Sequence, residues 1–289
     1  MEAVLIYGLV ASVTLALTAI GFSLTFGISR VANFAMGGLY LFAAYLPWLL
    51  IKNFGLPYGL VAVISIVVTA FLGALIYWGV VMRVRGIMLA EVISTFAIGI
   101  ALLELIRAVG LVGFGAKLQP WLDGVIPVGN MVVDYQRLFV VFVGVVLVIG
   151  LWLFTRRSKM GLSFRAIAQN ERTALALGME SDRVAMWSMV VGSALIAIAS
   201  LTIFPLEQLQ VDKGYDILVL ALTVAIVGGI ESTAGIVLAS FILGFLQVIV
   251  GRYIGTSWVM VVNLAAIILV LALRPSGLLG HLKELEERV

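Results

Sequence analysis

The sequence predicts an all-α polytopic membrane protein with about 8–9 transmembrane helices, some of them broken or re-entrant, in two pseudo-repeated halves. Of its 289 residues, 63% are hydrophobic and 11% are charged, whereas a soluble domain carries about 25% charged residues. Uncharged apolar stretches of about 20 residues, enough to cross a hydrocarbon core of ~30 Å, recur along the chain. The absence of cysteine excludes a disulfide framework and a thiolate metal site.

The apolar stretches follow one another closely, so residues 1–289 are expected to form a single transmembrane domain. The first stretch is long enough to span and has Glu2 before it, which argues against a cleaved signal peptide. The third is expected to be tilted or to start after Pro57. In order, the expected spans are residues 4–28, 31–51, 53–82, 87–107, 138–154, 184–206, 232–251 and 253–273. Residues 217–230 number only 14 and are expected either to cross or to re-enter.

Two polar segments separate the spans. Residues 113–136 are expected to be a periplasmic loop, and apolar residues alternate there around Gly129 and Asn130, which predicts a small β-hairpin. This hairpin either docks an external partner or is a plain surface turn.

The second polar segment, residues 156–183, holds six of the eighteen basic residues and lies between two apolar stretches. Short loops rich in Lys and Arg stay in the cytoplasm. With nine crossings and the N-terminus outside, twelve basic residues lie inside and six outside, which supports this orientation. Within the segment, residues 165–178 are expected to form one helix, capped by Ser163 and ended by Gly178. A helix joined to two spans can act as a lever.

The apolar side of this helix is expected to comprise Ala166, Ile167, Ala174 and Leu177, with Gln169 and Arg172 as polar contacts. An apolar patch on a cytoplasmic loop indicates a partner that covers it. The alternative is an amphipathic helix on the membrane lipid surface.

Polar and small residues inside the membrane indicate a substrate pathway. Residues 23–38 are rich in them, and the candidates are Ser23, Thr25, Gly27, Asn33 and Gly37. The other interpretation of this stretch is close helix packing through small residues. Glu231 is a further candidate, either lining a pore or lying at the cytoplasmic surface.

Other membrane acids have simpler explanations. Glu91 lies close in sequence to Arg83 and Arg85, which predicts an interfacial ion pair, and Glu104 lies one helical turn from Arg107.

The motifs that are missing from the sequence exclude several functions. There is no P-loop, serine–histidine pairing, HExxH or CxxC. We therefore expect no enzyme, no resident cofactor or metal, and no ATP binding by a P-loop. The net charge of +3 reflects cytoplasmic loops rather than a nucleic-acid face.

The chain also shows a weak internal repeat. Residues 21–38 and 228–244 are both punctuated by glycine, with a polar break followed by a helix of small residues. Transporters are often built from two such halves, although glycine is common in membrane helices generally.

Four motifs in order resemble the permease subunit of hydrophobic and branched-chain amino acid ABC importers. They are LTFGISRVANFAMGG (24–38), RAIAQNERTALALGM (165–179), VGGIESTAGIVLASFILG (227–244) and LRPSGLLG (273–280). The resemblance covers nearly the whole chain. It implies a protein of the bacterial inner membrane that provides half of a translocation pathway. It also implies three kinds of partner: a second permease subunit, two ATPase subunits that bind the ATP, and a periplasmic substrate-binding protein.

In that family, the segment 156–183 corresponds to the loop that docks the ATPase. By resemblance, the residues expected to couple are Arg165, Gln169, Asn170, Glu171, Arg172, Ala174 and Gly178. The general importer motif has Glu-Ala-Ala before the glycine, whereas this chain has Arg172-Thr173-Ala174, with the glutamate displaced to Glu171. Related permeases serve urea, amides or aromatic acids, and an ion-coupled secondary transporter is the alternative from another class.

Overall fold

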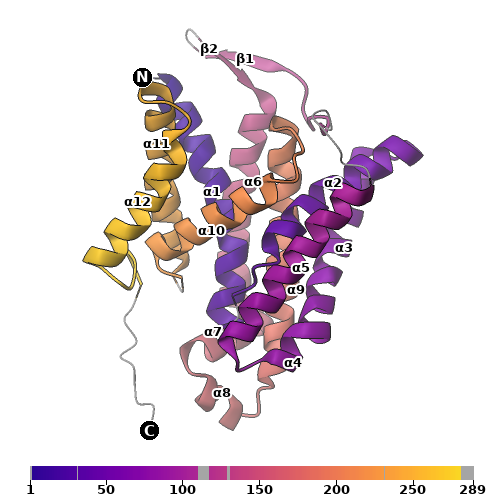
Figure 1. The fold of residues 1–289 in the computed structure, drawn as a ribbon, viewed down its shortest axis with the longest axis vertical. Coiled ribbons are helices and arrows are strands. Elements are labelled where there is room, and N and C mark those ends of the chain that lie inside the picture. Colours follow the sequence, from indigo (N-terminus) through magenta and orange to yellow (C-terminus); the bar gives the residue numbers. More distant parts are fainter. Residues whose placement is uncertain (1, 31, 110–116, 129–130, 231, 281–289) are drawn as a thin grey trace.

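The computed structural model is a bundle of helices and describes residues 2–30, 32–109, 117–128, 131–230 and 232–280 (Figure 1). Within these ranges, six helices are long and apolar enough to cross a membrane, which confirms the polytopic helical class. They are α1 (Glu2–Ser29), α3 (Tyr58–Ile76) with its continuation, α5 (Met88–Val109), α6 (Tyr135–Arg157), α9 (Ser181–Ile203) and α11 (Thr233–Tyr253).

Three further helices of the bundle are shorter or less apolar. They are α2 (Met36–Phe54), α10 (Lys213–Gly228) and α12 (Trp258–Leu273). The 16 residues of α10 extend about 24 Å at 1.5 Å per residue, less than a hydrocarbon core of ~30 Å. Length alone therefore does not make α10 a full crossing.

Helix α1 is the centre of the bundle and packs against α6, α9, α10 and α11. Small residues allow the close approach. A Cβ on Gly21 would lie 3.1 Å from the carbonyl oxygen of Gly192 in α9, and a Cβ on Gly244 in α11 would lie 2.5 Å from Cα of Ser12. Because there is no hydrophobic force between helices in lipid, such close packing is what holds them together.

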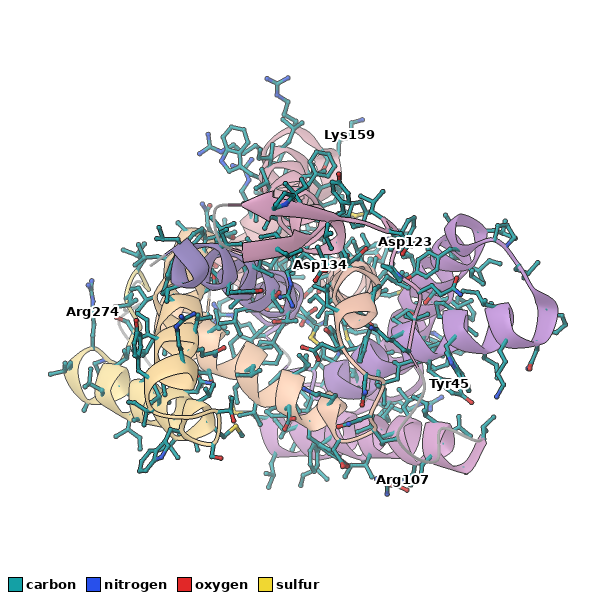
Figure 2. All side chains as sticks on the ribbon, turned by 90° about the horizontal axis from the view of Figure 1, so that it is seen from above. Tyr45, Arg107, Asp123, Asp134, Lys159 and Arg274 are labelled. Atoms are coloured by element: carbon teal, nitrogen blue, oxygen red, sulfur yellow. The ribbon has the colours of Figure 1, made fainter. Side chains whose placement is uncertain are left out.

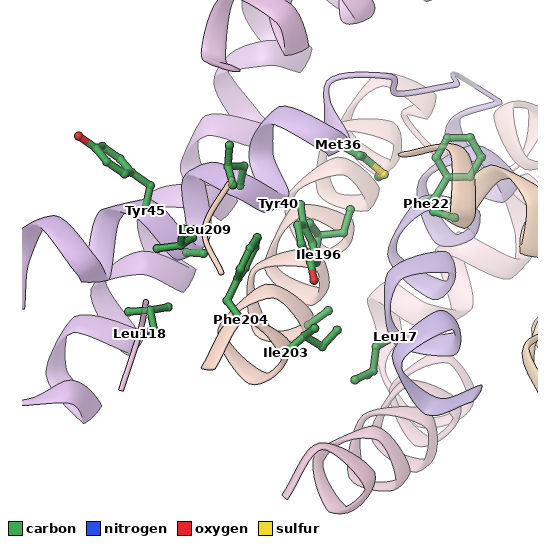
Figure 3. Packing of buried hydrophobic residues seen from close by; sticks show 14 of the residues in the cluster. Leu17, Phe22, Met36, Tyr40, Tyr45, Leu118, Ile196, Ile203, Phe204 and Leu209 are labelled. Carbon is green, nitrogen blue, oxygen red and sulfur yellow. The ribbon is translucent and has the colours of Figure 1, made fainter. Parts of the chain in front are cut away.

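The largest core cluster among the described residues joins α1, α2, α9 and α10 and includes residues of α5 and α6 (Figure 3). The rings of Tyr40 and Phe204 lie 5.2 Å apart between their centroids. Ser200 Oγ donates to the carbonyl oxygen of Tyr40 at 2.5 Å. This contact fixes α2 against α9.

Helix α3 begins at Tyr58, directly after Pro57, which is one of the two predicted alternatives. Proline suits a helix start because its missing N–H has no helical partner there. The helix continues through a π-helical turn, η1 (Tyr77–Val81), into α4 (Met82–Val84). Arg83 folds back along this end, and its Nη1 donates to the carbonyl oxygen of Gly79 at 2.5 Å.

The predicted hairpin is present at one end of the bundle, which we call the hairpin end. Strand β1 (Val125–Val128) pairs antiparallel with β2 (Met131–Asp134), with Val125 opposite Asp134. The turn residues Gly129 and Asn130 lie outside the described residues. Trp121 N donates to Gln136 Oε1 at 3.0 Å, which attaches the loop to α6.

The opposite end carries α7 (Lys159–Gln169) and α8 (Glu171–Ala176), and we call it the loop end (Figure 1). The prediction of one helix over residues 165–178, capped by Ser163, was wrong. Ser158 caps α7 by accepting from Gly161 N at 2.8 Å. Asn170 then breaks the helix and caps α8 by accepting from Thr173 N at 3.0 Å. Short polar side chains compete with helical backbone bonds and so favour caps.

Gly178, predicted to end the single helix, lies two residues after the end of α8 and takes a left-handed φ of +83°, which suits a helix end. Seen from the hairpin end, the labelled basic residues Arg107, Lys159 and Arg274 lie at the periphery of the bundle (Figure 2).

Candidate functional site

Two of the four motifs, residues 227–244 and 273–280, meet beside Ser23 of α1 at the loop end. Ser23 Oγ in α1 donates to the carbonyl oxygen of Ile230 at 2.6 Å. Leu278 N donates to the carbonyl oxygen of Val227 at 2.8 Å. A Cβ on Gly277, which has φ +80°, would lie 2.6 Å from Gly229 N. The end of α10 is therefore held between α1 and the segment that follows α12.

A cavity of about 310 Å³ lies next to this junction, between α1, α6, α7 and α11, and we call it the loop-end cavity. Ser23 and Gly27 of α1 line it, opposite Arg165 and Gln169 of α7, with Thr233 of α11 beside them. Residues predicted for the pathway and residues predicted for coupling thus share one cavity. Because α7 forms part of the wall, a displacement of α7 changes the space next to α1.

The other predicted pathway residues are packed rather than exposed to this cavity. Thr25 is fully buried, and its Oγ1 lies 2.2 Å from where a Cβ on Gly192 would be. A Cβ on Gly37 would lie 2.3 Å from the carbonyl oxygen of Gly214 in α10. Gly38 approaches α5 in the same way. The packing interpretation of this stretch therefore holds for Thr25, Gly37 and Gly38.

Asn33 lies in the break between α1 and α2. Its Oδ1 accepts from Ala35 N at 3.1 Å, and its buried Nδ2 has no hydrogen-bond partner among the described residues. A buried donor without a partner is costly. Arg30 ends α1 in the left-handed conformation, with φ 55°. Glu231, the remaining candidate, lies outside the described residues.

The predicted coupling residues divide into buried and exposed groups. Ile167 and Ala174 are buried within the chain, so they do not form the docking face that the pattern predicted. The apolar surface that remains is formed by Leu162, Leu175 and Leu177, and Leu177 is 75% exposed. Arg165, Gln169, Asn170, Arg172 and Gly178 are exposed, and Glu171 is half-buried.

The sequence missed a polar cluster that joins this loop to the end of α4. Arg85 Nη2 lies 3.2 Å from Glu171 Oε1 and donates to Ser181 Oγ at 2.7 Å, while Nη1 contacts Asp182 Oδ1. Tyr77 OH donates to the same Asp182 oxygen at 3.0 Å. Burial disfavours the charged guanidinium, but Tyr77, Asp182 and Glu171 outweigh burial and raise the pKa of Arg85.

The ion pair predicted for Glu91 was wrong. Glu91 is buried, and its Oε1 accepts from Gly86 N at 2.8 Å, while Arg85 turns to Glu171 and Asp182. The predicted pair of Glu104 and Arg107 is confirmed at 2.8 Å.

A second, larger cavity of about 810 Å³ lies at the hairpin end, and we call it the hairpin-end cavity. It runs along α1 from Tyr7 to Thr18, which is about 16 Å of helix. The sequence did not indicate this cavity. The available signal was a set of polar residues in apolar helices, which line it: Thr14, Thr18, Gln247 and Asn263.

Comparison with known families agrees with this architecture. The family model described as "Branched-chain amino acid transport system / permease component" matches residues 4–271. The chain belongs to this family. The chain is accordingly a transport permease component and not an enzyme.

Relatives within the family match along almost their whole length. The high-affinity branched-chain amino acid transport system permease protein BraD of Pseudomonas aeruginosa is 29% identical and is covered to 95%, with 96% of this chain. The corresponding LivH protein of Escherichia coli is 29% identical, with 95% and 94% of the two chains covered. A probable branched-chain amino acid permease protein LivH of Methanocaldococcus jannaschii is 27% identical over 97% of this chain and 91% of its own.

One solved structure has a fold similar to that of this chain. A chain of PsaBC from Streptococcus pneumoniae in complex with Fab superposes with a TM-score of 0.50 at 16% identity, and covers 92% of this chain and 90% of its own. At this identity the likeness concerns the fold alone.

Proposed function

We propose that the chain is the membrane permease of an ATP-driven importer and provides half of the translocation pathway for branched-chain or other hydrophobic amino acids. One observation carries the proposal: α1, with the pathway residues Ser23 and Gly27, and α7, with Arg165 and Gln169, line the same cavity. The named substrates of the relatives BraD and LivH support the amino acid assignment.

The proposed orientation places the loop end in the cytosol and the hairpin end outside the membrane. Basic residues gather at the loop end, including Arg156, Arg157 and Lys159, and short basic loops stay cytoplasmic. With α2, α10 and α12 counted, the chain would make nine crossings of the bacterial inner membrane. The helix breaks before α2 and before α11 support the two-half arrangement.

In this proposal the ATPase subunit docks on α7 and α8. The exposed Leu162 of α7, with Leu175 and Leu177 of the α8 region, offers apolar side chains, and the exposed Arg172 of α8 adds a charge. Two ATPase subunits would bind ATP, and this chain would hold no cofactor of its own. A second permease subunit would complete the pathway, and a periplasmic binding protein would deliver substrate at the hairpin end.

Two alternatives differ in substrate or energy source. Permeases of the same family could carry urea, amides or aromatic acids through the same architecture. An ion-coupled secondary transporter would need acids placed in the membrane for coupling, and the candidates are Glu91, Glu104 and Glu231. Glu91 is bonded to Gly86 and Glu104 to Arg107 at helix ends, and Glu231 lies outside the described residues.

Reconstitution of the complex in vesicles tests the proposal. With the ATPase subunits and binding protein present, uptake of leucine should require ATP inside and should continue when the proton and sodium gradients are collapsed. Uptake that persists without ATPase subunits and stops with the gradients would support the secondary transporter instead. Uptake of urea or benzoate in place of leucine would change the substrate that we assign to the chain.

A further inference from the structure

The hairpin-end cavity carries charges of both signs at its mouth. Arg137 begins α6, Glu207 follows the 3₁₀ turn after α9, and Lys213 and Asp216 begin α10. Lys213 Nζ lies 3.5 Å from Glu207 Oε2. Asp216 has no ion-pair partner among the described residues. Such a mouth can receive a molecule that bears one positive and one negative group.

Arg137 is held in place from two sides. Its Nε lies 3.3 Å from Asp134 Oδ2, and its guanidinium lies 4.8 Å from the ring centroid of Tyr7. A cation fixed in this way is oriented before a ligand arrives, which lowers the cost of binding.

Asn263 provides the second, independent observation. Within α12 it is the buried residue, 1% exposed, in a helix that is otherwise apolar. Gln247 Nε2 of α11 donates to Asn263 Oδ1 at 3.0 Å, and this bond orients the amide. Asn263 Nδ2 has no hydrogen-bond partner among the described residues and belongs to a residue that lines the cavity. A buried donor of this kind is satisfied when a ligand supplies an acceptor.

The cavity continues toward the predicted pathway. Thr18 and Ile217 line both the hairpin-end cavity and a small cavity that Met36 and Gly37 also line. The hairpin-end cavity also has an apolar part of its wall, formed by Val10, Leu15, Leu206, Leu220, Val259 and Met260. A polar mouth above an apolar wall matches a molecule whose charged groups and apolar side chain lie at opposite ends.

We propose that the hairpin-end cavity is an outer binding site for a zwitterionic amino acid with an apolar side chain. The cations Arg137 and Lys213 recognise the carboxylate, and Glu207 and Asp216 recognise the ammonium group. The Asn263 amide donates to a ligand acceptor. This inference rests on the proposed function and gives the permease itself a share of the selectivity.

The same chemistry occurs in a zwitterionic lipid headgroup, so the experiment separates the two sources. The assembled importer, without nucleotide and without the binding protein, is placed in nanodiscs of phosphatidylglycerol, and binding of radiolabelled leucine is measured. Leucine should bind. Leucinamide, which lacks the carboxylate, and 4-methylpentanoate, which lacks the ammonium group, should each bind at least about tenfold more weakly.

Variants then locate the site on this chain. Asn263→Leu, Lys213→Gln and Asp216→Asn should each weaken leucine binding by about tenfold. Lys213 and Asp216 are at the mouth, so their variants test the site even if Asn263→Leu does not assemble. Arg252→Gln is the matched control, because Arg252 is an exposed cation at the end of α11 and does not line the cavity.

Three results would overturn the inference: no binding of leucine, equal binding of the singly charged analogues, or unchanged binding in the mouth variants. Loss of leucine binding when phosphatidylethanolamine is added would assign the cavity to lipid instead. ATP-driven uptake is measured separately, with the binding protein present, so that failure of the outer site can be distinguished from failure of the proposed function. If uptake occurs but leucine does not bind in the cavity, the proposed function is retained and only the outer site is rejected.

Discussion

Arg85 and Glu171 lie 86 residues apart in the sequence, yet Arg85 Nη2 is 3.2 Å from Glu171 Oε1. Glu171 opens α8, and Arg85 follows α4, so the contact joins the loop between α6 and α9 to the α3–α5 pair. With Ser181 and Asp182 on the same guanidinium, one side chain connects three segments of the loop end.

Replacement of Arg85 should uncouple the transporter more than it unfolds it. Asp182 and Glu171 are at least 40% exposed, and exposed ion pairs contribute about 0–1 kcal/mol. Arg85→Gln should therefore shift the unfolding midpoint only slightly but lower the ratio of leucine imported to ATP hydrolysed. Arg83→Gln is the matched control, since Arg83 bonds to Gly79 of its own helical segment. Equal ratios in both variants would rule out the connecting role of Arg85.

The docking surface is best tested at Leu177. This side chain is 75% exposed, so Leu177→Glu should not disturb folding but should weaken association with the ATPase by about tenfold or more. Co-purification of the ATPase with the permease measures this. Leu122→Glu, at an exposed leucine of the hairpin end, should leave co-purification unchanged. Ala174→Glu is less useful because Ala174 is 2% exposed and the variant would bury a charge.

The junction of the glycine motifs should depend on Gly277. In Gly277→Ala, the left-handed φ of +80° costs about 1–2 kcal/mol, and the new Cβ would meet Gly229 N at 2.6 Å. Gly55→Ala carries the strain alone, because φ is +62° and nothing lies within 4 Å. Thermal unfolding of both variants should show the larger loss for Gly277→Ala. Equal losses would mean that the junction can move apart.

Close packing of α2 against α10 predicts a cost at Gly37. The Cβ of Gly37→Ala would lie 2.3 Å from a backbone oxygen of Gly214, and overpacking of this kind costs about 1–3 kcal/mol. Gly150→Ala in α6 has open space around it and should be neutral or stabilising by about 0.5–1 kcal/mol. Unfolding midpoints of the two variants check the difference. A Gly37→Ala protein as stable as Gly150→Ala would contradict the packing interpretation.

Variants of Asn33 distinguish a role in the pathway from a structural role. Asn33→Leu removes the acceptor for Ala35 N and also the unpartnered Nδ2. If Asn33 lies on the pathway, the rate of uptake or the substrate range should change. Asn33→Ser keeps a short oxygen acceptor beside Ala35 N without burying a charge at a position that is 1% exposed, and it should preserve the fold. Kinetics of leucine uptake for the two variants provide the test. Normal uptake by Asn33→Leu would remove it from the pathway.

The transmembrane architecture could be predicted because it depends on local length and composition. The six apolar helices long enough to cross a membrane, the start at Tyr58 and the hairpin strands follow from apolar runs, Pro57 and alternation. Caps were harder. Ser158 and Ser163 are both reasonable caps, and only the structure shows that Ser158 accepts from Gly161 N. Local pattern does not decide between neighbouring residues of the same type.

The sites were harder to predict because they are made by contacts between distant segments. Arg85 has Glu91 six residues away, but its partners are Glu171 and Asp182. Helix α12 is apolar on all sides, so the sequence did not indicate which side Asn263 faces. The meeting of Ser23 with Ile230 and of Gly277 with Gly229 likewise depends on how the helices cross.

Helix α1 lines the hairpin-end cavity with Tyr7–Thr18 and the loop-end cavity with Ile20–Ile28. Ala19, between these two stretches, is fully buried in the core. When a straight helix tilts about a fixed point near its middle, its two ends move in opposite directions. If α1 tilts as a straight helix about this buried point, one cavity would widen as the other narrows, and the two would not be open at the same time.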